Sequence, residues 1–315
     1  MVYLIDIGGL QAVLTQVYNT MIGNCADLIG ISSAIAGLGT LWYVAGHIWL
    51  DIAEARPVNV RPLFRPLLIG LAITFFPSVI GMLNGILQPA VDGTASLAGN
   101  ANQAVATLLQ EKQQMLQQSS EWQMYTGPDG SGSLDKWEQL SGEADSGVLS
   151  GLSNRVKFEM AKASYNLRNS VKVWLSEILE TMFESAALCI NTVRTFYLIV
   201  LAILGPLALA FSVYPGMEGS LSHWLSQYIH VFLWLPVANL FGSLIAQIQQ
   251  EMIRLDIAQL AATGQTSFGP TDAAYLVFLL MSIVGYFTVP SVTRFIVRTG
   301  GLGAKLWRTN FIRQN

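Results

Sequence analysis

The sequence predicts an all-α, polytopic integral membrane protein with about five transmembrane helices and a long helical periplasmic insertion between spans two and three. Of the 315 residues, 52% are hydrophobic and only 12% are charged, whereas an average soluble domain carries roughly 25% charged residues. Long stretches also contain no Asp, Glu, Lys or Arg at all. This composition excludes an ordinary cytosolic enzyme and a disordered chain. The net charge of −3 gives no support to a nucleic-acid binder that neutralises phosphates.

Five stretches are long and apolar enough to be transmembrane helices, which need about 20 residues to cross a hydrocarbon core of about 30 Å. None of them contains Asp or Glu, and only the last contains an arginine, Arg294. Pro236 and Pro290 interrupt the fourth and fifth stretches. The predicted spans are residues 28–50, 66–87, 195–215, 224–246 and 273–297.

The N-terminal segment, residues 1–27, is predicted to be an amphipathic periplasmic segment that forms an interfacial helix on the bilayer. The first Lys or Arg of the chain is Arg56, so this segment lacks the basic region that a signal peptide requires. We therefore expect no signal peptide.

Basic residues in short loops predict the orientation, because they favour the cytoplasmic side. They gather in the 51–65 turn and in the 298–315 tail, and an odd number of spans puts both on one side. We therefore expect a bacterial inner (cytoplasmic) membrane protein with a periplasmic N-terminus and a cytoplasmic C-terminus. The 216–223 turn is then cytoplasmic, and the 88–194 region and the 247–272 loop are periplasmic.

The central region, residues 88–194, is predicted to be helical with one flexible loop. Its first part is rich in Ala, Gln and Leu, which favour helix. The run from Gly127 to Ser133 breaks any helix. It does not fit a calcium-binding loop, because Leu134 stands where the sharp turn needs glycine.

A single long helix is predicted from residue 152 into the third span, because no Gly or Pro occurs between Leu152 and Leu204. Its apolar residues recur with a 4-4-3 spacing, a period near 3.67 that is typical of an almost straight helix. Two interpretations stay open: this apolar stripe packs on the helix at 95–120, or it contacts neighbouring subunits of an oligomer. The stripe consists of Leu152, Val156, Met160, Ala163, Leu167, Val171, Trp174, Ile178 and Met182.

No pattern of catalytic, cofactor-binding or metal-binding residues is visible in the sequence. Spans without carboxylates argue against proton relays and against intramembrane aspartate proteolysis. Ser222 and His223 lie close together but without an oxyanion-hole motif. Cys25 and Cys189 make neither a disulfide framework nor a metal cluster. We therefore expect no enzyme activity, no cofactor and no metal.

The candidate site residues are those that pack helices or carry charge at the edge of the membrane. Gly81 and Gly85 form a small-xxx-small face that lets helices approach closely. Glu180 and Glu184 share a helix face and either ring a pore mouth or are simply solvated. Arg194 either lines an aqueous pathway or extends its charge to the interface. The candidate oligomer contacts on the stripe are Val171, Trp174 and Ile178.

Three stretches of the first 95 residues, residues 36–45 (AGLGTLWYVA), 61–70 (RPLFRPLLIG) and 75–89 (FFPSVIGMLNGILQP), resemble the conjugative-transposon TraJ family. This family is related to the TrbL-like polytopic inner-membrane subunits of type IV secretion systems. The resemblance implies a structural and channel-forming role in DNA and protein transfer between cells, and it supplies no catalytic residues. The implied partners are other inner-membrane and stalk or pilus subunits, further copies of the chain in a homo-oligomer, the lipid bilayer and, transiently, transferred DNA.

A stand-alone membrane transporter or pore is the alternative function. The sequence shows no inverted repeat and no carboxylate inside a span, which are features of secondary transporters. Both absences favour the secretion-system role over the alternative.

Overall fold

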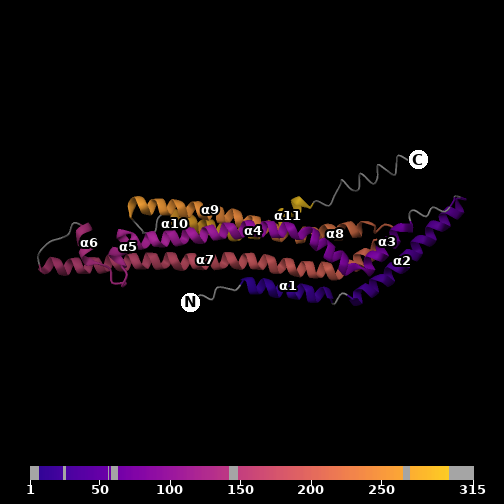
Figure 1. Ribbon diagram of the computed structural model, residues 1–315, viewed down its shortest axis with the longest axis horizontal. Coiled ribbons are helices and arrows are strands. Elements are labelled where there is room, and N and C mark those ends of the chain that lie inside the picture. Colours follow the sequence, from indigo (N-terminus) through magenta and orange to yellow (C-terminus); the bar gives the residue numbers. More distant parts are fainter. Residues whose placement is uncertain are drawn as a thin grey trace. The chain divides into compact units, whose positions relative to one another are not determined.

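The computed structural model describes residues 7–23, 26–55, 57, 63–141, 148–264 and 270–297. Within these ranges all regular secondary structure is helical, which confirms the predicted all-α class (Figure 1). The helices are α1 (Ile7–Gly23), α2 (Ala26–Ala53), α3 (Phe64–Thr74), α4 (Phe76–Gln118), α5 (Ser120–Tyr125), α6 (Leu134–Ser141), α7 (Val148–Phe211), α8 (Gly219–Phe232), α9 (Trp234–Thr263), α10 (Pro270–Tyr286) and α11 (Val289–Ile296).

Three helical segments of the described chain are long and apolar enough to cross a membrane, namely Leu28–Ala53, Gly151–Phe211 and Gly219–Thr263. Two bent helix pairs, α3 with α4 and α10 with α11, raise the number to five if each pair counts as one span. The predicted spans fall on these five segments. The side of the membrane on which each loop lies stays a prediction.

The second predicted span differs from the expected single helix at residues 66–87. Helix α3 ends at Thr74, and α4 begins at Phe76 with a change of direction of 85°. Pro77 explains the break, because it has no N–H to donate to the carbonyl of Ile73 and its ring clashes with that carbonyl in a continuous helix. Proline is well tolerated in the first turn of a new helix, where Pro77 lies in α4.

The fifth predicted span is also divided. Helices α10 and α11 meet at an angle of 54° around Phe287 and Thr288. Pro290 lies in the first turn of α11, in agreement with the predicted disturbance of this span. By contrast, α7 continues through Pro206 and α4 continues through Pro89.

Helix α7 is one continuous helix of 64 residues, which confirms the prediction drawn from the missing Gly and Pro (Figure 1). The predicted loop at residues 127–133 is also confirmed. Gly132 has a φ of 69°. A Cβ atom there would lie 2.7 Å from the carbonyl oxygen of Met124, so only glycine fits this turn.

The chain divides into two compact units. Unit 1 comprises Met1–Gly93, Leu188–Ala238 and Thr288–Asn315, and unit 2 comprises Thr94–Ala187 and Asn239–Phe287. Two predicted segments lie wholly or partly outside the described residues: the whole basic tail at 298–315, and the part of the basic 51–65 turn that holds Arg56 and Arg61.

In unit 1, aromatic side chains join α4, α7 and α8. The indole Nε1 of Trp224 donates a hydrogen bond to the carbonyl of Leu201 at 2.8 Å, and its ring packs against Phe76 at 5.7 Å between centroids. Gly205 lies directly under this pair: a Cβ atom there would be 2.1 Å from Phe76 Cζ. The Tyr214 hydroxyl reaches α2, where it donates to the carbonyl of Ile35 at 3.1 Å.

In unit 2, a small aromatic core joins the short helices α5 and α6 to α7. It is formed by Met124, Trp137 and Phe158, with Tyr125 packed against it. Tyr125 also stacks on Tyr165, with 5.0 Å between ring centroids. Both contacts on α7 lie on a different helix face from the predicted apolar stripe.

Candidate functional site

The predicted stripe on α7 is exposed within the chain. Leu167 is 66% exposed, Val171 52% and Trp174 62%, whereas Ile178 is partly buried. The face of α7 that packs inside unit 2 is instead built from Asn154, Phe158, Tyr165 and Ala186, which are buried. The interpretation in which the stripe packs on the 95–120 helix is therefore wrong for this chain. The interpretation in which it contacts other subunits stays a prediction.

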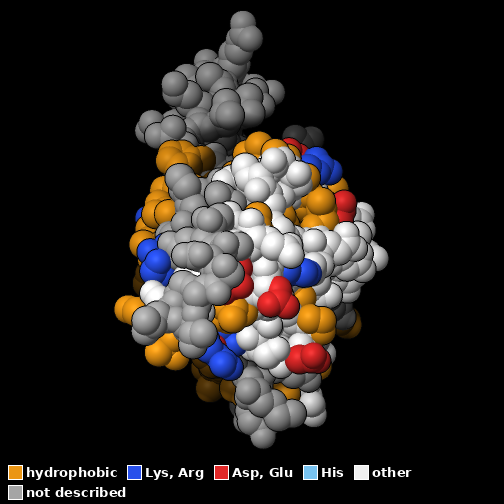
Figure 2. Space-filling model, turned by 90° about the vertical axis from the view of Figure 1, so that its left-hand side faces the viewer, with side chains coloured by type: hydrophobic (Ala, Val, Ile, Leu, Met, Phe, Trp, Pro, Cys, Tyr) orange, Lys and Arg blue, Asp and Glu red, His pale blue; other side chains and the backbone are white. Residues whose placement is uncertain are grey.

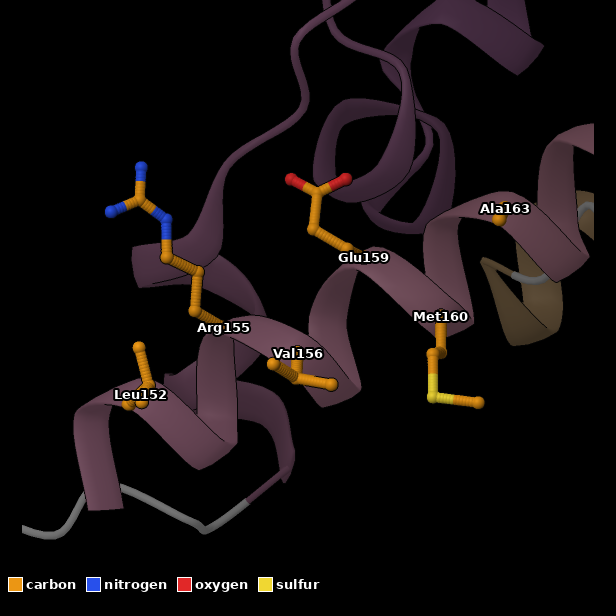
Figure 3. A pocket seen from close by; sticks show the side chains of 6 residues that line it. All are labelled: Leu152, Arg155, Val156, Glu159, Met160 and Ala163. Carbon is orange, nitrogen blue, oxygen red and sulfur yellow. The ribbon is translucent and has the colours of Figure 1, made fainter. Parts of the chain in front are cut away.

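At its N-terminal end the stripe continues into an open, shallow hollow of about 440 Å³ on α7. Figure 3 shows its six lining residues, with Arg155 and Glu159 on one side of the helix and Met160 on the other. Leu152, Val156 and Met160 are all more than half exposed. An apolar row flanked by charges of both signs is typical of a protein-binding helix face.

The charged surface of the molecule has no large region of one sign in the view of Figure 2, where Lys and Arg side chains are interspersed with Asp and Glu and with hydrophobic side chains. This distribution agrees with the small net charge of −3.

The two predicted packing glycines, Gly81 and Gly85, lie in α4 and face open space. A Cβ atom at either position would meet no other atom within 4 Å. No helix of the described chain therefore packs closely on this face. The predicted close approach of a helix to Gly81 and Gly85 could then only involve another molecule, and it stays a prediction. The glycines that permit close packing inside the described chain include Gly205 and Gly285, which the sequence patterns did not single out for this role.

Glu180 belongs to a charged cluster in unit 2 that brings α4, α7, α9 and α10 together. Lys112 forms an ion pair with Asp256, and Lys172 forms one with Asp272. With Glu180 these four residues line a cavity of about 160 Å³. Opposite charges far apart in the chain give no signal of pairing, so the sequence alone does not reveal these four residues.

The electrostatics of this cluster act against ionisation of Glu180, which lies outside the predicted spans. Partial burial raises the pKa of its carboxyl above the ordinary value, and the nearby Glu184 and Glu177 carboxylates raise it further. Glu184 itself is half-buried on the same helix. Whether the two glutamates ring a pore mouth stays a prediction.

Arg194 is buried in unit 1, with 9% of its surface exposed. Its Nε donates a hydrogen bond to the carbonyl of Phe232 at 3.2 Å, and the guanidinium carbon lies 5.0 Å from the centre of the Phe232 ring. The side chain therefore turns toward α8 instead of extending freely toward the aqueous interface.

His230, Ser222 and His47 have ordinary structural contacts. His230 Nε2 lies 3.1 Å from the carbonyl oxygen of Pro290. The Ser222 hydroxyl donates to the carbonyl of Gly219, and His47 stacks on Tyr43. Across the described ranges no three His, Cys, Asp or Glu residues are grouped so that they can hold a metal ion. The expectation that the protein needs no metal or cofactor stays a prediction.

Comparison with curated proteins gives no match. A family model described as homologues of TraJ from a Bacteroides conjugative transposon matches residues 5–315. The match extends well beyond the first 95 residues, where the resemblance in sequence is visible by motif, and it implies a role in the conjugation machinery. The chain therefore belongs to the family of TraJ homologues of conjugative transposons.

Proposed function

We propose that this protein is a non-enzymatic, oligomeric and channel-forming component of the inner-membrane complex of a type IV secretion machine. The observation that carries the proposal is the exposed apolar stripe on α7. The whole stripe lies outside the predicted third span, in a region that we expect to face the periplasm. Its partners are further copies of the chain or the stalk and pilus subunits of the machine.

The exposed stripe supports an assembly role because large apolar side chains are costly to leave in water. Burial of apolar surface stabilises a contact by about 25 cal/mol per Å². Leu167 and Trp174 are both more than 60% exposed. A row of such residues on one helix face fits a helix of another subunit, which would use the same three- and four-residue spacing.

A contact between the predicted 51–65 and 216–223 turns supports their placement on one side of the membrane. Arg65 lies at the end of the predicted 51–65 turn, and Glu218 lies in the predicted 216–223 turn. The two side chains form an ion pair at 3.0 Å inside unit 1, and Arg65 also donates to the carbonyl of Ser212. The predicted order of spans puts both turns on the same side of the membrane, which is what such a contact requires.

The non-enzymatic part of the proposal is supported by the contacts of the candidate catalysts. His230 and Ser222 are engaged with backbone carbonyls and are not paired with each other. We expect alanine variants of His47, Ser222, His223 and His230 to keep substantial transfer activity. An alanine variant that assembles normally and loses all transfer would contradict this part of the proposal.

Cysteine crosslinking tests the assembly role of the stripe. In a background where Cys25 and Cys189 are serine, Trp174→Cys should give crosslinked dimers with a short bismaleimide in membranes. Asn169→Cys is the matched control, because Asn169 is exposed on the same helix but off the stripe. Equal crosslinking at both positions would indicate random collision and not a specific contact.

The same pair of positions provides a functional test. Trp174→Asp places a carboxylate in the proposed contact, where an unpaired charge costs several kcal/mol. Conjugative transfer should collapse together with the oligomers of the purified protein, while the abundance of the protein stays near that of the wild type. Asn169→Asp should be tolerated. Normal transfer by Trp174→Asp would refute the proposed contact.

A further inference from the structure

Unit 1 contains a cavity of about 300 Å³ that no part of the proposed assembly role uses. Five helices line it, namely α1, α4, α7, α8 and α9. Its walls combine apolar side chains, such as Leu198 and Leu235, with a polar side. The polar lining includes Tyr18, Asn84, Gln88, Asn191, Arg194 and Thr195.

Arg194 is the one charged residue among those that line the cavity. It is 91% buried, and of its donor atoms Nε is bonded to the carbonyl of Phe232. None of the ion pairs of the described chain includes Arg194. A buried guanidinium without an acidic partner is costly, because the charge has lost water without gaining a counter-charge.

The polar groups opposite Arg194 cannot supply that counter-charge. Tyr228 donates to Asn84 Oδ1 at 2.7 Å, Asn84 Nδ2 donates to the Tyr18 oxygen at 3.0 Å, and the two tyrosine oxygens lie 2.8 Å apart. These bonds form a closed ring in which the three side chains satisfy one another. The ring ties α1 to α4 and α8 and so fixes one wall of the cavity.

The remaining polar lining is also neutral. Thr195 donates its hydroxyl to the carbonyl of Asn191 at 2.9 Å, and Gln88 donates to Asp92 at 2.8 Å. The cavity therefore offers one buried cation surrounded by amides, hydroxyls and apolar side chains. Arginine in such a setting binds oxyanions, because its planar donors match phosphate and carboxylate oxygens.

The position of the cavity relative to the predicted spans favours a phosphate group over a carboxylate as its ligand. Gln88 directly follows the predicted second span, and Arg194 directly precedes the predicted third span. Both lie at span ends assigned to the same membrane side, which is the level of lipid head groups. An arginine between helices at this level can bind the phosphate of a lipid head group through charge-assisted hydrogen bonds.

We propose that this cavity binds a phosphate-bearing anion, with Arg194 as its charged ligand. The sources of that group at this depth are an anionic phospholipid, whose chains run along the adjoining apolar wall, and free inorganic phosphate. The inference does not depend on the secretion role of the protein. A cavity of this size holds a head group with its glycerol but no stretch of nucleic acid.

The test uses the purified full-length protein, delipidated in detergent, with three probes in parallel: phosphatidylglycerol, diacylglycerol with the same acyl chains, and inorganic phosphate. We expect phosphatidylglycerol to raise the apparent Tm and diacylglycerol to have little effect. Native mass spectrometry should show retained phospholipid on the wild type. If inorganic phosphate gives the same stabilisation, the anion is free phosphate and not a lipid.

Arg194→Gln should weaken phosphatidylglycerol binding at least about tenfold, since it removes the charge-assisted hydrogen bonds. Arg194→Lys should keep part of the binding. The matched control is Arg294→Gln, because Arg294 belongs to unit 1 and is exposed outside the cavity. Without ligand, Arg194→Gln should be at least as stable as the wild type, and saturating phosphatidylglycerol should reverse that order.

Two results would overturn the proposal. One is equal binding by the wild type and Arg194→Gln for every phosphate-bearing probe. The other, which needs no variant at all, is a delipidated wild type that neither retains nor is stabilised by phosphatidylglycerol or phosphate. These binding measurements do not depend on oligomers or on transfer activity. Failure of the proposed secretion role can therefore be distinguished from failure of the proposed anion binding.

Discussion

The ion pair between Lys172 and Asp272 is expected to be a main determinant of how α7 and α10 pack in unit 2. The two charged atoms lie 2.5 Å apart, and the side chains of Lys172 and Asp272 are only 19% and 9% exposed. Lys172→Met keeps the length of the side chain and removes its charge. It leaves the Asp272 carboxylate buried without its ammonium partner.

The cost of this change follows from the burial of the pair. Removal of one partner of a buried ion pair costs about 3–5 kcal/mol. The partial exposure of Lys172 places the expected cost at the lower end, about 3 kcal/mol. With about 2–4 °C of Tm per kcal/mol in larger domains, the apparent Tm should fall by roughly 6–12 °C.

Thermal unfolding in detergent, followed by circular dichroism, measures this shift. Asp272→Asn should cost less than Lys172→Met, because the more exposed lysine can turn its ammonium group toward water. The double variant should recover much of the loss, since it leaves no unpaired charge.

Arg254→Met is the matched control for this cycle. It breaks the exposed pair of Arg254 with Glu251, whose side chains are 58% and 68% exposed, and should cost no more than about 0.5 kcal/mol. Equal Tm losses for Lys172→Met and Arg254→Met, or a double variant as unstable as the sum of its two single changes, would refute the reasoning.

Three further predictions follow from other parts of the chain. Gly205→Ala should destabilise the protein by about 1–3 kcal/mol or more, because the added methyl group overlaps the buried Phe76 ring. The control is Gly81→Ala, which lies in open space and should leave the apparent Tm unchanged. Equal Tm losses for the two variants would contradict the packing of α7 on α4. Glu180→Gln should raise the apparent Tm at neutral pH, since the raised pKa of Glu180 means that ionisation opposes folding. The gain in Tm should shrink as the pH falls through that pKa toward the unfolded value near 4.5. A gain in Tm that is independent of pH would exclude this cause. The third test uses a background where both native cysteines are serine. A cysteine at Ser131 should react with an impermeant maleimide once the outer membrane is permeabilised, whereas one at Asn315 should react only after the inner membrane is broken. Reversed labelling would refute the predicted orientation.

The sequence by itself determined the features that depend on neighbouring residues in the chain. The absence of Gly and Pro from 152 to 204 was enough to predict α7 as one helix, because helix continuity is decided by local backbone preferences. The loop at residues 127–133 follows from its glycines and proline in the same way. The composition predicted the all-helical class, and three short stretches indicated the family whose model matches residues 5–315.

The tertiary structure decided every feature that depends on which distant segments meet. The apolar spacing on α7 predicted a buried stripe within the chain or between chains, but only the fold shows that Phe158 and Tyr165 form the internal contact and leave Trp174 exposed. The pairing of Lys172 with Asp272, and the enclosure of Arg194, likewise join segments remote in the sequence. Periodicity describes one helix at a time, whereas burial and charge pairing depend on the helix opposite, and that helix is chosen by the packing of the whole chain.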